Sequence, residues 1–258
     1  MTKSNTSAEA PVEAILRDEL AHGDVVLGTI GPILGHLLAN HDHSLFSDEI
    51  VARVRGMLSS VSRQLLVVQG EDQDEGDPHG FANRHFDELS AMIADNATFL
   101  THCHALAIES HLAERLRARN SIDPVLSPLM QSLIASDDAA TASSAMAALA
   151  SQARFIQQQK RMELQVQELP ADLFHHAMLT WRSHASEVDE SVKAKIETRL
   201  RKEFDESRSR IGMLSRLVNA MGNGARVALS ISHAGVSLFL TALASASNQD
   251  RDLSLIHI

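Results

Sequence analysis

Helix-starting signals recur along the range Asp123–Trp181, and this range constrains the fold more than any other part of the sequence. Two proline-led openings, at Pro124/Pro128 and at Pro170, each begin an apolar run with helical spacing. A long Ala-rich run lies between them and favours helix. Aromatic residues make up only 3% of the chain and tyrosine is missing, which argues against a β-sandwich or barrel. The sequence therefore predicts an all-α protein.

Capping residues mark where several of these helices begin or end. Asp137 or Asp138 precedes the Ala-rich run and is a candidate N-cap. Helices are also predicted over Val12–Ala21, Val25–Ala39, Ser47–Gln69, Phe81–Arg119 with a break at Asp95-Asn96, Val192–Met221, and two short pieces around Gly235. From Pro124 onward, helix pairs recur at a spacing of about 40 residues, which is typical of HEAT-like repeats and predicts a stacked, solenoid-like domain.

Changes in composition along the chain predict its domain organisation. Residues 1–11 read as a disordered tail, and residues 12–69 as a helical hairpin. Residues 70–80 are rich in acids, Gly and Pro and are predicted to form an acidic linker. Residues 81–252 form the predicted multi-helical stacked domain. The last six residues, LSLIHI, resemble a translated sequencing adapter, so we expect residues 253–258 to be an artefact and the natural chain to continue beyond them.

The segment Val25–Ala39 is apolar almost all round, so it must be covered by the core or by a partner. Close contact with a protein partner, or self-association in the hairpin, is predicted through four of its residues: Val25, Gly28, Gly31 and Gly35. The segment is shorter than the roughly 20 apolar residues that cross a bilayer. We therefore expect no membrane association.

Charge and cysteine content restrict the function further. The net charge of −10 disfavours non-specific binding to nucleic acid, and we expect none. The single cysteine, Cys103, permits neither an intramolecular disulfide nor a thiolate zinc site. The N-terminus lacks the apolar core of a signal peptide. Together these features predict a cytoplasmic protein.

Ser127–Met178 resembles a helical domain family of unknown function found in alphaproteobacteria. The similarity lies in SPLMQSLIASDDAATASSAM, in the QARFIQQQ run and in ELPADLFHHAM. The resemblance implies a multi-helical, repeat-like cytoplasmic protein. It supplies no catalytic residue that could be carried over to this chain.

Histidine is the one abundant residue type that could carry chemistry, with 14 copies. His102, His104 and His111 form the densest cluster and are the candidate ligands of a metal-binding helical bundle. One helix brings at most two of them to one face, so zinc would need a ligand from elsewhere. Separate, solvated or hydrogen-bonded histidines are the favoured interpretation of the cluster, and metal is the alternative.

Phosphotransfer is the second alternative, because an exposed histidine near an acid on a helical hairpin is typical of phosphorelay proteins. His85, in the run His-Phe-Asp-Glu-Leu, is similar to the phosphoacceptor box of sensor kinases, and His36 and His22 are further candidates. The chain lacks the basic-Thr-Pro segment that follows that box. With no convergent catalytic set and no expected cofactor, a non-enzymatic protein-interaction or regulatory scaffold is the favoured function.

Overall fold

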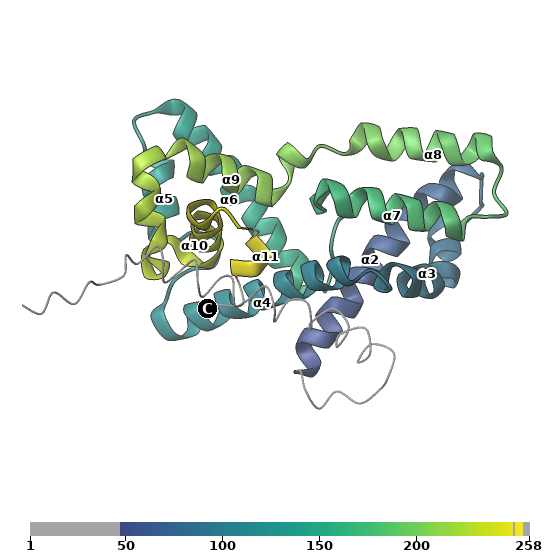
Figure 1. Cartoon of the computed structure of the whole chain (residues 1–258), viewed down its shortest axis with the longest axis horizontal. Helices are drawn as coiled ribbons and strands as arrows, with labels where there is room; N and C mark the ends of the chain where they lie inside the picture. Colours follow the sequence, from purple (N-terminus) through teal and green to yellow (C-terminus); the bar gives the residue numbers. More distant parts are fainter. Residues whose placement is uncertain (1–46, 250, 255–258) are drawn as a thin grey trace, which may run out of the picture.

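The computed structural model describes residues 47–249 and 251–254, and within these ranges it consists of helices and connecting turns without a strand (Figure 1). The all-α fold is confirmed. The helices are α2 (Asp48–Asp72), α3 (Pro78–Ala94), α4 (Ala97–Asn120), α5 (Pro128–Ile134), α6 (Ala139–Lys160), α7 (Ala171–His184), α8 (Glu190–Glu203), α9 (Arg210–Ala220), α10 (Ile231–Ser247) and α11 (Arg251–Ser254). Three 3₁₀ segments, η1 (Val166–Glu168), η2 (Glu206–Arg208) and η3 (Gly222–Leu229), connect some of them. No described helix is both long and apolar enough to cross a bilayer.

Side-chain caps fix several helix starts where the sequence predicts them. The Ser47 hydroxyl accepts a hydrogen bond from the backbone N–H of Ile50. Asn96 caps α4, which confirms the predicted break after α3. Asp138, rather than Asp137, caps the Ala-rich α6 through Thr141. Each cap gives a partner to a backbone N–H group that the first helical turn would otherwise leave unpaired.

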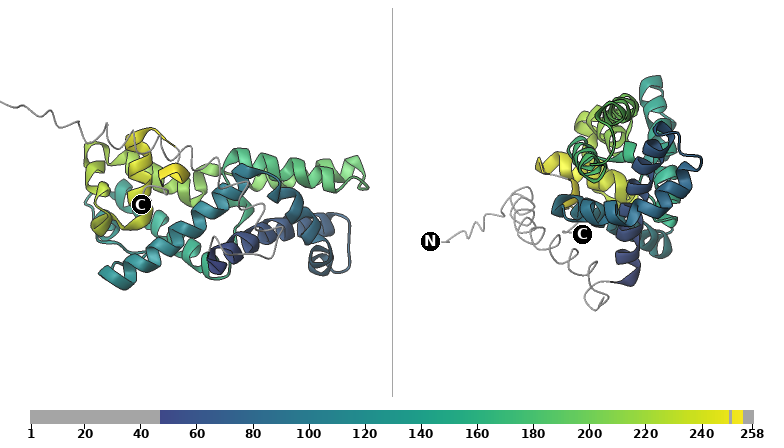
Figure 2. Two further views of the ribbon diagram at one scale, coloured as in Figure 1. Left: turned by 60° about the horizontal axis from the view of Figure 1, so that its bottom comes forward. Right: turned by 90° about the vertical axis from the view of Figure 1, so that its right-hand side faces the viewer.

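The larger apolar core lies at the end of the molecule that α2, α3, α7 and α8 form (Figures 1 and 2). Leu65 of α2, Leu89 of α3 and Ile196 of α8 are fully buried there. Trp181 of α7 is also fully buried, and its indole N–H donates to the Gln69 side-chain oxygen at 2.9 Å. That bond gives the one polar atom of Trp181 a partner inside the core.

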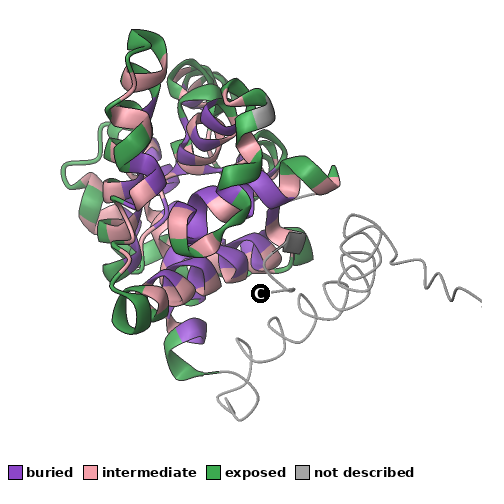
Figure 3. Ribbon diagram, turned by 90° about the vertical axis from the view of Figure 1, so that its left-hand side faces the viewer, coloured by how far each residue is buried: buried purple, intermediate pink, exposed green. Residues whose placement is uncertain are grey.

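A second core lies at the opposite end, between α5, α6, α9 and α10. Seen from that end, buried residues lie on the inner faces of the helices and exposed ones on the outer faces (Figure 3). Helix α6 serves both cores, because Ala148 packs into the second and Phe155 into the first. Helix α4 contributes Phe99 and Leu106 to the first core and contacts α10 through a small third cluster.

The acidic stretch at 70–80 contains the end of α2, a short turn and the first turn of α3. Helices α2 and α3 pack against each other, and both contribute to the larger core. Residues on the two sides of the stretch therefore share one core. The first part of the predicted hairpin, before residue 47, lies outside the described residues. Regular solenoid-like stacking stays a prediction.

The single helix predicted over Val192–Met221 is wrong. The chain leaves helical geometry at Phe204 and passes through η2 before α9 begins. Asp205 accepts hydrogen bonds from the backbone N–H and hydroxyl of Ser207, and Ser209 caps α9 through the N–H of Gly212. The break lets the apolar residues of α8 face the first core and those of α9 face the second.

Candidate functional site

The structure describes one of the three candidate phosphoacceptor histidines. His85 lies exposed on α3, where its ring is 4.7 Å from that of Phe81, measured between centroids. His22 and His36 lie outside the described residues. The prediction of a phosphoacceptor thus rests, in the described part of the chain, on His85 alone.

The candidate metal ligands on α4 do not converge. His102 is buried, and its Nδ1 lies 3.0 Å from a carboxylate oxygen of Asp252. His104 is partly buried, and desolvation lowers its pKa. His111 lies a further seven residues along the helix and is half-buried. Within residues 47–249 and 251–254, no three His, Cys, Asp or Glu side chains form a group that could hold a metal ion.

Cys103, between two of these histidines, is fully buried. Burial, and then the negative charge of Asp252, raise the pKa of its thiol far above the ordinary value. A protonated, solvent-shielded thiol is a poor nucleophile and a poor metal ligand. Cys103 therefore acts as a small apolar side chain of the first core.

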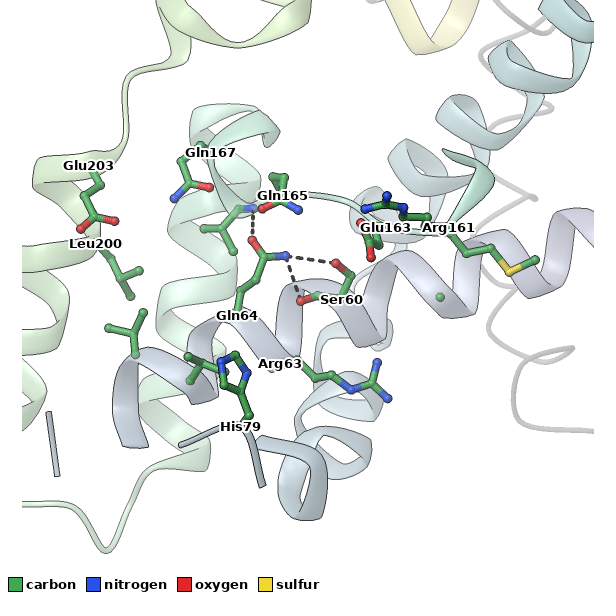
Figure 4. A pocket seen from close by; sticks show the side chains of 15 residues that line it. Ser60, Arg63, Gln64, His79, Arg161, Glu163, Gln165, Gln167, Leu200 and Glu203 are labelled. Carbon is green, nitrogen blue, oxygen red and sulfur yellow. Dashed lines mark hydrogen bonds between the residues drawn. The ribbon is translucent and has the colours of Figure 1, made fainter. Parts of the chain in front are cut away.

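A cavity large enough for a ligand lies beside Met162, and we call it the Met162 pocket (Figure 4). Its volume is about 620 Å³, within the usual range for ligand sites. Its walls come from four places: the middle of α2, the start of α3, the α6–η1 connection together with η1, and the C-terminal end of α8. Segments about 100 residues apart in sequence thus meet around one hollow.

Gln64 of α2 holds the α6–η1 connection in place. Its side-chain N–H₂ donates to the Leu164 carbonyl at 2.8 Å. Its side-chain oxygen accepts from the Val166 N–H at 3.1 Å (Figure 4). The Ser60 hydroxyl also donates to the Leu164 carbonyl. These bonds satisfy backbone groups in a non-helical segment, so the wall is fixed before any ligand arrives.

Gly56 allows the connection to approach α2 closely. A Cβ atom at Gly56 would lie 2.5 Å from Met162 Cβ and 2.7 Å from its carbonyl oxygen, which is closer than atoms can pack. Met162 itself has a positive φ of 58°, which an L-residue adopts only where its surroundings hold it. No local pattern predicts this contact, since a lone glycine inside a helical pattern looks the same wherever it lies.

The pocket has an apolar floor and a rim of mixed charge. Val67, Val68 and Leu200 supply apolar surface, and Met162 is 36% exposed at the edge. The polar rim residues are His79, Arg161, Glu163, Gln165, Gln167 and Glu203. Ser60, the one hydroxyl that lines the pocket, donates its proton to the Leu164 carbonyl and accepts a hydrogen bond from the Gln64 side chain. The apolar floor suits binding of an apolar group.

A buried charge cluster, which the sequence did not predict, joins the two cores. Glu109 of α4 is fully buried and pairs with both Arg210 of α9 and Arg251 of α11, at N–O distances of 2.7 and 2.8 Å for each. The Ser237 hydroxyl donates to the same carboxylate at 2.7 Å. Arg210 also donates to Gln152 of α6. We call this group the Glu109 cluster.

The electrostatics of the Glu109 cluster keep its carboxylate ionised. Burial alone raises the pKa of Glu109, but the charges and hydrogen bonds of Arg210 and Arg251 outweigh it and hold the pKa well below its ordinary value. The Arg210 guanidinium also stacks on the Phe155 ring, 3.7 Å from its centroid. The carboxylate and the two guanidinium groups are paired with one another. The cluster therefore positions helices and offers no free charged group to a substrate.

Comparisons with known protein families, with curated proteins and with solved structures gave no match.

Proposed function

We propose that the protein is a non-enzymatic interaction scaffold that holds an apolar side chain of a partner protein in the Met162 pocket. The observation that supports this best is the construction of the pocket. Hydrogen bonds hold one wall in place without a ligand, and the floor is apolar. Partner side chains bind best in such pre-organised, desolvated hollows. The mixed-charge rim is suited to orienting the backbone around that side chain.

Other features of the chain agree with a scaffold. The Glu109 cluster fixes several helices relative to one another without offering free reactive groups. The apolar segment Val25–Ala39 is a second candidate contact surface, for a partner or for self-association. Ser127–Met178 resembles a helical family without assigned activity, which supports a regulatory or interaction role. The single cysteine, Cys103, supports a location in the cytoplasm.

A peptide selection tests the proposed pocket. Random peptides displayed on phage would be selected on the full chain, and their affinities measured by fluorescence polarisation. Met162→Glu keeps a side chain of similar length but adds charge at the pocket edge. We expect it to weaken binding at least tenfold, or about 1.4 kcal/mol.

Met146→Glu is the matched control, because Met146 lies on α6 outside the pocket lining and is 52% exposed. Peptide affinity should change less than twofold in this variant. Circular dichroism establishes that both variants are folded. The proposal fails if no peptide binds, or if the selected peptides bind Met162→Glu as tightly as the natural chain.

A further inference from the structure

Arg63 of α2 lies where a second hollow meets the Met162 pocket. This second hollow lies between α2 and α3, has a volume of about 630 Å³, and is called here the α2–α3 groove. Its charged lining residues are Arg55 and Arg63 of α2 and Asp87 of α3. Arg63 also lines the Met162 pocket (Figure 4). A ligand in the pocket can therefore reach the Arg63 side chain.

Local contacts hold the guanidinium group of Arg63 in place. Its Nε–H donates to the side-chain oxygen of Asn83 on α3 at 3.1 Å. Its guanidinium carbon lies 3.6 Å from the centroid of the Phe86 ring, which is close enough for a cation–π interaction. An arginine that is already held on two sides loses little conformational freedom when it binds a ligand. Arg63 is thus pre-organised for binding.

The two terminal nitrogens of Arg63 are free to bind a ligand. Among the described residues, they donate to no acceptor and no carboxylate forms an ion pair with them, although Asp87 lines the same groove. Arg63 is half-buried, so water competes less for these N–H groups than at an open surface. The planar end of a guanidinium matches a carboxylate, with two parallel hydrogen bonds. The chemistry of Arg63 therefore favours a carboxylate ligand.

The distance from Arg63 to the pocket floor defines the spacing within that ligand. Val67 of the floor comes four residues after Arg63 on α2, so their Cβ atoms lie about 5–6 Å apart on one face of the helix. In an extended peptide, residues two positions apart point to the same side and are separated by about 7 Å. A peptide with an apolar side chain on the floor can thus place a carboxylate beside Arg63 two residues away.

We propose that the partner of the Met162 pocket carries an acidic residue two positions from its apolar anchor, and that Arg63 binds this carboxylate. The inference rests on the proposed function, because the anchor is the side chain that fills the pocket. Asp87, Glu163 and Glu203 also line the two hollows and would repel a run of several acids. A single acidic residue next to an apolar one is therefore the pattern that suits this surface.

The peptides selected on the full chain are the probes for this inference. Each is synthesised with an amidated C-terminus, so that its side chains carry its only carboxylates. Each acidic peptide is compared with a version in which Asn or Gln replaces the acid, and fluorescence polarisation measures the affinity of both. The chains compared are the natural one, Arg63→Gln and the control Arg84→Gln. Arg84 is exposed on α3, carries the same charge and lines neither hollow.

We expect the selected peptides to share an acidic residue two positions from an apolar one. Replacing the acid by its amide should weaken binding to the natural chain about fivefold or more. The Arg63→Gln variant should bind the two versions about equally, and it should bind the amide version as tightly as the natural chain does. The Arg84→Gln variant should still prefer the acidic version.

Three outcomes would overturn the inference while the apolar anchor still stands. The selected peptides could bind without such an acid, or Arg63→Gln could keep the preference for the acidic version. The third outcome is weaker binding of the amide version to Arg63→Gln, which would mean that Arg63 supports the shape of the pocket. If no peptide binds at all, the proposed function and this inference both fail.

Discussion

Replacing Glu109 by glutamine should destabilise the protein more than most other conservative changes. The substitution keeps the shape of the side chain but removes the negative charge that two buried guanidinium groups share. Arg210 and Arg251 have side chains only 3% and 8% exposed, so water cannot replace the lost charge. Removing one partner from a buried ion pair costs about 3–5 kcal/mol. We expect the Glu109→Gln variant to lose that much free energy of unfolding at pH 7.

Urea titration followed by circular dichroism measures this loss, and urea leaves the ion pairs unscreened. Glu114→Gln is the control, because Glu114 is 37% exposed, and Arg53, which lies 3.4 Å from it, keeps Glu49 as a closer partner. It should cost no more than about 1 kcal/mol. A loss below about 1 kcal/mol for Glu109→Gln, with an unchanged denaturant slope, would refute this argument. It would mean that Arg210 and Arg251 are not left with uncompensated buried charge when Glu109 is neutralised.

The pH dependence gives a second readout of the same group. Because the pKa of Glu109 is depressed in the folded state, its contribution is fully present above its ordinary pKa of 4.5 and is lost as the pH falls towards the lower folded value. The stability difference between the natural chain and Glu109→Gln should thus be constant from pH 6 to 8. It should shrink below pH 4.5 by up to about 1.4 kcal/mol per pH unit. A difference that stays constant to pH 3 would contradict this assignment.

Three further predictions follow from local geometry. Gly56→Ala forces Met162 away from α2 and should cost about 1–3 kcal/mol in urea titration, whereas Gly76→Ala, with nothing within 4 Å, should be close to neutral. Asp138→Ala removes the cap of α6 and should lower the midpoint of the urea transition; an unchanged midpoint would contradict the cap. The Cys103 thiol should react with a thiol reagent only after unfolding, so rapid labelling in buffer would contradict its burial.

Features that depend on neighbouring residues were predictable from the sequence. Asn96 lies at the predicted break and Asp138 is one of the two predicted caps, because a cap bonds to a backbone N–H only three residues away. The break between α8 and α9 was missed because Phe204 and Ile211 are seven residues apart. That spacing keeps the apolar pattern in phase, as if one helix continued.

The candidate sites could not be predicted, since they depend on contacts between distant residues. Arg210 and Arg251 are 101 and 142 residues from Glu109, and no local pattern marks them as its partners. The Met162 pocket likewise requires α2 to meet a connection about 100 residues later. The histidines drew attention through their number, but number alone says nothing about convergence. Only the packing of the helices determines which side chains meet.

The sharing of α6 between the two cores also limits how such a protein can evolve. The first core takes residues from 50–107 and then from 155–200, and the second takes residues from 129–148 and then from 214–242. The contributions therefore alternate along the chain. Any continuous gene fragment that encodes the whole of one core therefore also encodes part of the other. This region can be duplicated or fused to another protein only as a whole.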